Sequence, residues 1–232
     1  MGLLIPRRMR LPAVVVATSA WGIAVVVGVL VAGQRHADPI DRTLIDQVHA
    51  VVGNGAGLAV FLLVPTDTDV IGAAIALLAG VALCRRRWDV ALLAVATPVA
   101  CVAITELALK PLFGRRLYGL FSYPSGHAVA SIAVYTVAIL AFASAASRLR
   151  RCFAIVGWIV LVAVVMTGLV GMNCHYPTDA VGGVCVAVGV VLPCAIATDA
   201  WRRRRTPPPK IPQPRSSSDD YNPHPVDYSL SE

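Results

Sequence analysis

Charged residues are scarce in this sequence of 232 residues, at 14% of the total, and aromatic residues make up only 6%. The six cysteines form no C-x-x-C pair and most lie in apolar runs, so neither a zinc site nor a disulfide framework is indicated. Hydrophobic residues reach 57%, and the mean hydropathy is +0.71. These values are far from those of soluble domains and are typical of an integral membrane protein.

The formal net charge of +7 does not indicate a nucleic-acid partner. The basic residues lie in small clusters between apolar segments, where they act as signals for membrane topology. We therefore expect membrane lipids, and no nucleic acid, around this chain.

Six apolar stretches predict the fold class. A bilayer core of about 30 Å requires about 20 helical residues, and most of the stretches are long enough, the second being short. We predict an all-α membrane protein with six transmembrane helices in a bundle. The stretches cover residues 11–33, 69–84, 88–109, 127–147, 153–172 and 180–200.

Arginine clusters predict the orientation of these helices. The clusters lie at residues 7–10, 85–87, 148–151 and 202–205. Because they fall on alternate connections, all of them can face the cytoplasm, together with both termini. We expect a multi-pass protein of the plasma membrane. The basic N-terminus also fits a signal peptide, but its apolar run exceeds the usual length of roughly 7–15 residues, which favours a retained helix.

Two further segments lie outside the six stretches. Residues 34–68 hold a polar part and then an apolar part, residues 51–64, which is interrupted by glycines. We interpret the apolar part as an interfacial or re-entrant helix on the outer face. Residues 206–232 are rich in proline and serine, which predicts a disordered cytoplasmic tail after a membrane domain at residues 1–205.

The P-S-G-H sequence at residues 124–127 opens the fourth apolar stretch. Free backbone N–H groups at a helix start bind anions, and Gly126 lets a ligand approach the backbone closely. His127 in the first turn could then donate a proton to a phosphate oxygen. An ordinary helix start with an interfacial histidine remains the alternative.

His175 and Asp179 are spaced so that the carboxylate can reach the imidazole and fix its tautomer, as a nucleophilic histidine requires. Asp179 could also simply cap the sixth helix. In this topology both histidine segments fall on the outer side of the membrane. Three cations lie next to them, although basic residues are disfavoured in outer loops. Binding an anion would explain those cations, which are Lys110, Arg115 and Arg116. Glu106 should pair with Lys110 at i,i+4.

These segments resemble motifs of the type 2 phosphatidic acid phosphatase superfamily, which includes vanadium haloperoxidases and bacterial polyprenyl-diphosphate phosphatases. The motifs read K-x6-R-P, P-S-G-H and S-R-x5-H-x3-D. P-S-G-H is complete at residues 124–127, and H-x3-D is complete at His175 and Asp179. The resemblance covers roughly residues 50–200. It implies a bacterial membrane member with six helices and an active site at the extracytoplasmic face.

The resemblance also implies an activity, namely hydrolysis of a phosphomonoester or diphosphate of a lipid, without a metal or another cofactor. By the family's mechanism, His175 attacks phosphorus to give a phosphohistidine, Asp179 holds its ring and His127 protonates the leaving oxygen. The implied phosphate ligands are Lys110, Arg115, Arg116 and the backbone at Ser125 and Gly126.

Two motifs are incomplete in this chain. The R-P of the first motif falls at Leu117 and Tyr118, and the S-R of the third falls at Gly168 and Leu169. Losing a charged donor typically costs a few kcal/mol, on the order of hundreds-fold in rate. A catalytically weak or inactive member that binds anionic lipid or a protein partner is therefore the alternative. The motifs select neither among lipid phosphates nor between Arg115 and Arg116, and they indicate no oligomeric state.

Overall fold

The computed structural model describes residues 3–53, 57–143 and 147–205. These residues form helices almost throughout, together with one short hairpin. The elements are η1 (Arg7–Met9), α1 (Arg10–Val31), α2 (Pro39–Val52), α3 (Leu58–Leu63), η2 (Val64–Thr66), α4 (Thr68–Cys84), α5 (Trp88–Ile104), η3 (Thr105–Leu109), α6 (Lys110–Phe113), β1 (Arg116–Leu117), β2 (Leu120–Phe121), α7 (Gly126–Ala143), α8 (Arg148–Gly171) and α9 (Pro177–Arg205).

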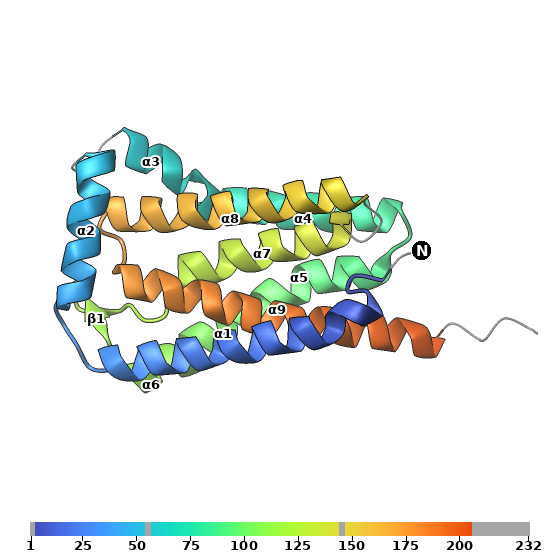
Figure 1. The fold of residues 1–232 in the computed structure, drawn as a ribbon, viewed down its shortest axis with the longest axis horizontal. Helices are drawn as coiled ribbons and strands as arrows, with labels where there is room; N and C mark the ends of the chain where they lie inside the picture. Colours follow the sequence, from blue (N-terminus) through green and yellow to red (C-terminus); the bar gives the residue numbers. More distant parts are fainter. Residues whose placement is uncertain (1–2, 54–56, 144–146, 206–232) are drawn as a thin grey trace, which may run out of the picture.

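The long helices α1, α4, α5, α7, α8 and α9 run alongside one another, and α2 lies across one end of the bundle (Figure 1). Helix α9 packs against α1, α5 and α7. Its contact with α7 is close because of Gly183, where a Cβ would lie 2.7 Å from the backbone oxygen of Ser125. This glycine fixes the start of α7 against the start of α9.

Within the described residues, four helices are long and apolar enough to cross a membrane. They are Arg7–Val31, Trp88–Phe113, Arg148–Gly171 and Pro177–Arg205. A fifth span results if α3 with η2 and α4 form one span that bends by 42°. The apolar part of α7, Gly126–Phe142, is shorter than these spans. Each predicted apolar stretch therefore corresponds to a helix, whereas the number of six spans stays a prediction.

The basic segments gather at the end of the bundle that lies opposite α2 (Figure 1). Arg202 reaches Asp89 at 3.7 Å, and Arg10 reaches Asp199 at 4.0 Å. Asp199 is buried and also accepts hydrogen bonds from the backbone N–H groups of Leu4 and Ile5. These contacts join the start of α1, the start of α5 and the end of α9.

Residues 34–68 form more helix than the sequence predicts. Helix α2 occupies the polar part, and it begins at Asp38, whose carboxylate accepts the N–H of Asp41 at 2.7 Å. Helix α3 occupies the apolar part and leads through η2 into α4 with the 42° bend, as in a broken span or a re-entrant loop. The predicted tail at residues 206–232 lies outside the described residues.

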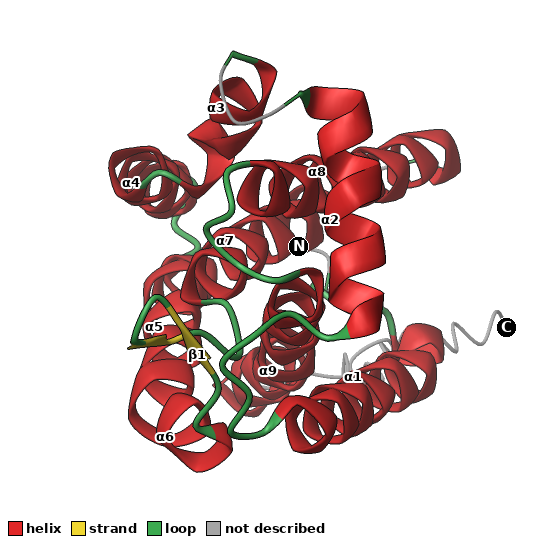
Figure 2. Cartoon of the chain, turned by 90° about the vertical axis from the view of Figure 1, so that its left-hand side faces the viewer, coloured by secondary structure: helices red, strands yellow, loops and turns green. Residues whose placement is uncertain are grey.

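The hairpin β1–β2 lies at the same end of the bundle as α2 (Figure 2). Its strands pair antiparallel around a two-residue turn of Tyr118 and Gly119, both with positive φ, as tight hairpin turns require. The backbone N–H of Arg116 donates to the oxygen of Gln34 at 2.9 Å, so the hairpin is tied to the connection between α1 and α2.

Candidate active site

The structure brings His127 and His175 together. Their ring centroids lie 5.9 Å apart, with 60° between the ring planes. His127 is in the first turn of α7, where Ser125 accepts the N–H of Ala128 at 3.3 Å in a capping hydrogen bond. His175 precedes α9, and the N–H of Ser125 donates to the backbone oxygen of Asp179 at 3.0 Å. The two helix starts therefore hold the two rings at one place.

Asp179 lies beside His175, as its spacing predicts. The Nδ1 atom of His175 and the Oδ2 atom of Asp179 are 3.7 Å apart, an ion-pair distance that is longer than a hydrogen bond. Nδ1 has no hydrogen-bond partner within the described part of the chain. The Asp179 side chain is fully buried, so its carboxylate faces the imidazole without competition from bulk water.

A cavity of about 490 Å³ opens at the two histidines. Its lining includes polar residues, namely Glu106, Lys110, Ser122, Gly126, His127 and His175. It also includes apolar side chains from α4, α5, α7 and the hairpin, namely Ile71, Val102, Ala130, Leu117, Leu120 and Phe121. A ligand with an anionic head and an apolar body would match this mixed lining.

Lys110 and Glu106 form the predicted ion pair, with Nζ and Oε1 2.7 Å apart. Glu106 belongs to η3, a π-helical turn of the kind often found at functional sites. A Cβ on Gly126 would lie 2.7 Å from Oε1 of Glu106, so a larger residue at this position would displace the carboxylate. The carboxylate therefore lies against the start of α7, and the cavity holds a negative group next to its lysine.

Of the predicted phosphate ligands, Lys110 and Gly126 line the cavity, whereas Ser125 is buried and its N–H donates to the backbone oxygen of Asp179. Arg115 does not line the cavity either. Its side chain has 0% exposure, and its guanidinium binds Asp41 and Asp179 and lies 4.2 Å from the ring centre of Tyr176. A guanidinium enclosed in this way has no open side for a substrate. The structure thus does not support the predicted phosphate contact of Arg115.

Arg116 is exposed and also lies outside the cavity lining. It donates to the oxygen of Gly119 at 3.1 Å and stacks 4.7 Å from the ring centre of Phe121, which does line the cavity. Of the Lys and Arg side chains in the described ranges, only Lys110 lines this cavity. A phosphate role for Arg116 stays a prediction.

The incomplete motifs have structural causes. Tyr118, at the place of the first motif's proline, has a φ of 50°, which the ring of proline forbids. A Cβ on Gly168 would lie 2.8 Å from the backbone of Leu62, which leaves no room for the third motif's serine. Leu169, at the place of its arginine, is buried in the core. The hairpin and α3 therefore occupy space that the complete motifs would need.

Asp41 and Thr178 are contacts of the site that the sequence did not single out. Asp41 is fully buried, and its carboxylate accepts hydrogen bonds from both the N–H and the hydroxyl of Thr178. Asp38 and Pro39 were the signal that a helix begins here, because aspartate before proline favours a helix start. No signal in the sequence shows that Asp41 is turned inward.

Two groups beside His175 have shifted acidities. Burial raises the pKa of the Cys174 thiol, which lines the cavity. Burial also raises the pKa of the Tyr176 phenol, and this effect exceeds the opposite influence of Arg115. Among the described residues, no group of three or more His, Cys, Asp or Glu could hold a metal ion.

Comparison with known proteins gives one family. The model of the PAP2 superfamily matches residues 111–203. The match includes His127, His175 and Asp179 and begins one residue after Lys110. No curated protein and no solved structure gives a significant match to the chain.

Proposed function

We propose that this chain, whose residues 111–203 match the model of the PAP2 superfamily, is an integral membrane phosphatase acting on a lipid phosphate. The proposed reaction is hydrolysis of a phosphomonoester or diphosphate of a lipid. The observation that carries the proposal is the pair of imidazole rings, 5.9 Å apart, at a cavity lined by both polar and apolar residues. Such a pair can place one ring on phosphorus and the other on the leaving oxygen.

The proposed first step forms a phosphohistidine. Because Asp179 faces Nδ1 of His175, Nε2 is the attacking atom, and its bond to phosphorus forms while the bond from phosphorus to the leaving oxygen breaks. His127 gives its proton to that oxygen. Asp179 stabilises the positive charge that develops on the His175 ring.

The second step reverses these roles. His127, now neutral, takes a proton from a water molecule whose oxygen attacks phosphorus, and the bond to His175 breaks. Inorganic phosphate leaves and both histidines return to their starting states. Lys110 and the backbone N–H groups at the start of α7 neutralise the phosphoryl oxygens in both steps. In this scheme His127, His175 and Lys110 line the cavity, and Asp179 acts from behind the His175 ring.

The apolar residues in the cavity lining support a lipid substrate. Ile71, Val102 and Ala130 come from three helices that pack side by side, and Leu120 and Phe121 come from the hairpin. An acyl or prenyl chain would remove this surface from water, at about 25 cal/mol per Å² of apolar area. Phosphatidic acid-like lipids and polyprenyl phosphates or diphosphates share this chemistry.

The arginine clusters support an extracytoplasmic site. They lie at the end of the bundle opposite α2 and the hairpin (Figure 1), and basic segments stay in the cytoplasm. We therefore place both termini in the cytoplasm, the six long helices across the plasma membrane, and the histidine pair at its outer surface. The substrate would enter from the outer leaflet.

A non-catalytic lipid-binding protein is the second candidate. It is favoured by Leu169 in place of the motif's arginine and by the Glu106 carboxylate beside Lys110. Both features lower the positive charge available to a transition-state phosphoryl group.

Phosphate release by the purified protein distinguishes the two functions. We expect hydrolysis of phosphatidic acid or of a polyprenyl phosphate or diphosphate, and a loss on the order of 10³-fold or more in His175→Ala. The control is His36→Ala, because His36 lies in the connection between α1 and α2 and does not line the cavity. Equal inertness of wild type and His175→Ala, with retained binding of anionic vesicles, would establish the non-catalytic function instead.

A further inference from the structure

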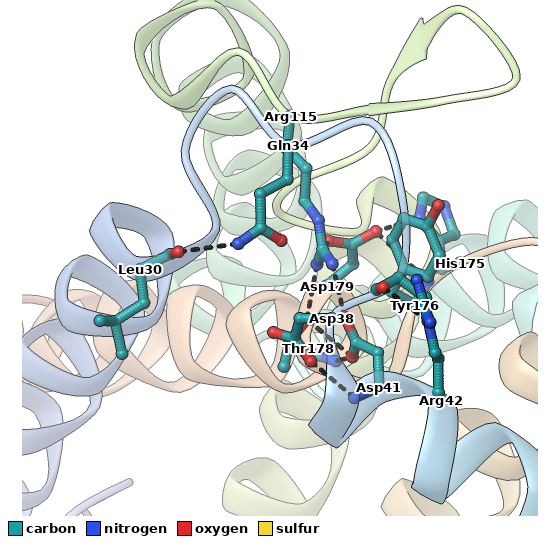
Figure 3. Close-up of polar contacts among 11 residues, drawn as sticks. Leu30, Gln34, Asp38, Asp41, Arg42, Arg115, His175, Tyr176, Thr178 and Asp179 are labelled. Atoms are coloured by element: carbon teal, nitrogen blue, oxygen red, sulfur yellow. Dashed lines mark hydrogen bonds and ion pairs between the residues drawn. The ribbon is translucent and has the colours of Figure 1, made fainter.

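A buried ionic network joins α2 to the residues behind His175 (Figure 3). The Nη1 atom of Arg115 donates to Oδ1 of Asp179 at 2.7 Å, and its Nη2 atom donates to Asp41. Asp41 also accepts the N–H of Thr178 at 3.0 Å and its hydroxyl at 2.9 Å. Asp41, Arg115 and Asp179 all have 0% exposure. The network therefore holds three formally charged side chains that bulk solvent does not reach.

The two oxygens of Asp179 have different partners in this network. Oδ1 accepts from Arg115, whereas Oδ2 accepts the N–H of Tyr176 at 3.3 Å and faces Nδ1 of His175 at 3.7 Å. Arg115 therefore fixes the carboxylate from the side away from the imidazole, and Oδ2 stays directed at the ring.

The charge of the network is not balanced. One guanidinium lies between two carboxylates, which leaves one excess negative charge among side chains that are not exposed to bulk solvent. Without Asp41, Arg115 and Asp179 would neutralise each other, and a neutral pair stabilises a positive imidazole weakly. Asp41 therefore keeps the surroundings of His175 negative.

A stabilising role alone does not explain this arrangement. Burying ions costs desolvation energy, and apolar residues of similar volume often give equal or greater stability. Arg115 and Asp41 are 74 residues apart in the sequence, yet both converge on the segment that precedes α9. The arrangement is explained if it sets the position and the charge of Asp179.

We propose that Asp41 on α2 is a positioning residue, which acts through Arg115 and Thr178 to orient Asp179 and to keep a net negative charge behind the nucleophile His175. This role rests on the proposed phosphatase function. Helix α2 is thereby part of the active-site architecture and not only a cover on the bundle end. Asp41 touches neither the cavity nor the substrate.

Several other charged or titratable groups surround His175. His127 on α7 faces its ring, and Cys174 precedes it in the chain. Glu106 in η3 and Lys110 at the start of α6 line the same cavity, and Tyr176 follows His175 and lies over Arg115. None of them changes in the variants below, so shifts between variants report the network.

A series of charge variants tests the proposal. Asp41→Asn removes a negative charge, so the neutral ring of His175 should persist to lower pH, and the acidic limb of the kcat/KM profile should move down. Arg115→Gln removes a positive charge and should move the same limb up. The double variant restores the charge balance and should return the limb toward its wild-type position. We expect kcat to fall on the order of 10- to 100-fold in Asp41→Asn, with KM little changed.

The matched control is Asp46→Asn, which removes the same charge from an exposed position of α2. It should leave both kcat and the acidic limb unchanged. The proposal would be overturned if the acidic limb moved equally in Asp46→Asn and Asp41→Asn. It would also be overturned if the limb moved in the same direction in Asp41→Asn and Arg115→Gln, because only a change of charge predicts opposite directions.

A second measurement does not depend on activity. The His175 imidazole can be titrated by nitrogen NMR in the full-length protein in detergent, with His175→Ala identifying its signal. The midpoint should fall by about half a pH unit or more in Asp41→Asn and rise in Arg115→Gln. If the wild type hydrolyses nothing but the midpoints move in this way, the network stands and the phosphatase function falls. Unchanged midpoints in folded variants would refute the network in either case.

Discussion

Glu106 forms an ion pair with Lys110 at the lining of the cavity that His127 and His175 share. Its Oε1 atom lies 2.7 Å from the place that a Cβ on Gly126 would take, so the carboxylate is close to the start of α7. A phosphate that binds Lys110 must approach this carboxylate. Glu106 therefore opposes anion binding at the same point where Lys110 favours it.

Glu106→Gln should tighten the binding of inorganic phosphate. The substitution keeps the side chain's size and removes a like charge a few ångströms from the bound anion, which is worth roughly 1 kcal/mol. The inhibition constant of phosphate in the hydrolysis assay should fall about fivefold. Asp69→Asn is the control, because Asp69 is exposed in the first turn of α4 and does not line the cavity. An unchanged constant in Glu106→Gln would mean that phosphate does not bind at Lys110.

The helices were predictable from the sequence because a membrane leaves little choice. Within a bilayer the backbone must satisfy its own hydrogen bonds, so an apolar run of sufficient length forms a helix. The fifth predicted stretch, residues 153–172, agrees with α8 at its C-terminal end, whereas the helix begins earlier, at Arg148. Helix α2 was missed because its polar sequence resembles a loop, and only the Asp38 cap marked its start.

The site was predictable only in part, for a different physical reason. His175 and Asp179 are close in sequence, so local geometry brings them together. Arg115 and Arg116 are adjacent and chemically alike, and which of them turns inward depends on Asp41, 74 residues away from Arg115. Single-sequence patterns do not contain such long-range pairing.

His127→Asn should separate the two proposed chemical steps. An aryl phosphate has a leaving group that departs without a proton, so His175 should still be phosphorylated by it, whereas water would lack its general base. The variant should therefore accumulate an acid-labile phosphohistidine with p-nitrophenyl phosphate and show a burst of p-nitrophenol. Rapid-quench measurements with phosphorus-labelled substrate detect both. The intermediate should be absent in His127→Asn combined with His175→Ala, and its presence there would place the nucleophile elsewhere.

Gly168→Ala should destabilise the protein. The added Cβ would lie 2.8 Å from backbone atoms of Leu62, and a backbone cannot move aside as a flexible side chain can. We expect a loss of about 1–3 kcal/mol in the free energy of unfolding, seen as a lower thermal midpoint in detergent. Gly157→Ala in the same helix is the control, since a Cβ there meets no atom within 4 Å. Equal midpoints for the two variants would show that α3 does not pack on α8 as described.

Cysteine labelling tests the predicted orientation with residues that the chain already has. Cys174 lines the cavity, whereas Cys84 at the end of α4 and Cys152 in the first turn of α8 lie near the arginine clusters, and all three are exposed. In proteins that keep one of these cysteines, a membrane-impermeant thiosulfonate added to intact cells should label Cys174 alone. Cys84 and Cys152 should react only after lysis.

The rate at Cys174 carries a further test. Cys174 is exposed, but the residues around it partly desolvate the thiol and raise its pKa, so the reactive thiolate is a small fraction at neutral pH. Labelling should therefore accelerate as the pH rises through the alkaline range. The attached group should also block hydrolysis, since this sulfur faces the space that the substrate needs. Labelling of Cys84 and Cys152 from outside, with Cys174 protected, would show the opposite orientation in the membrane, with the histidine pair at the cytoplasmic face.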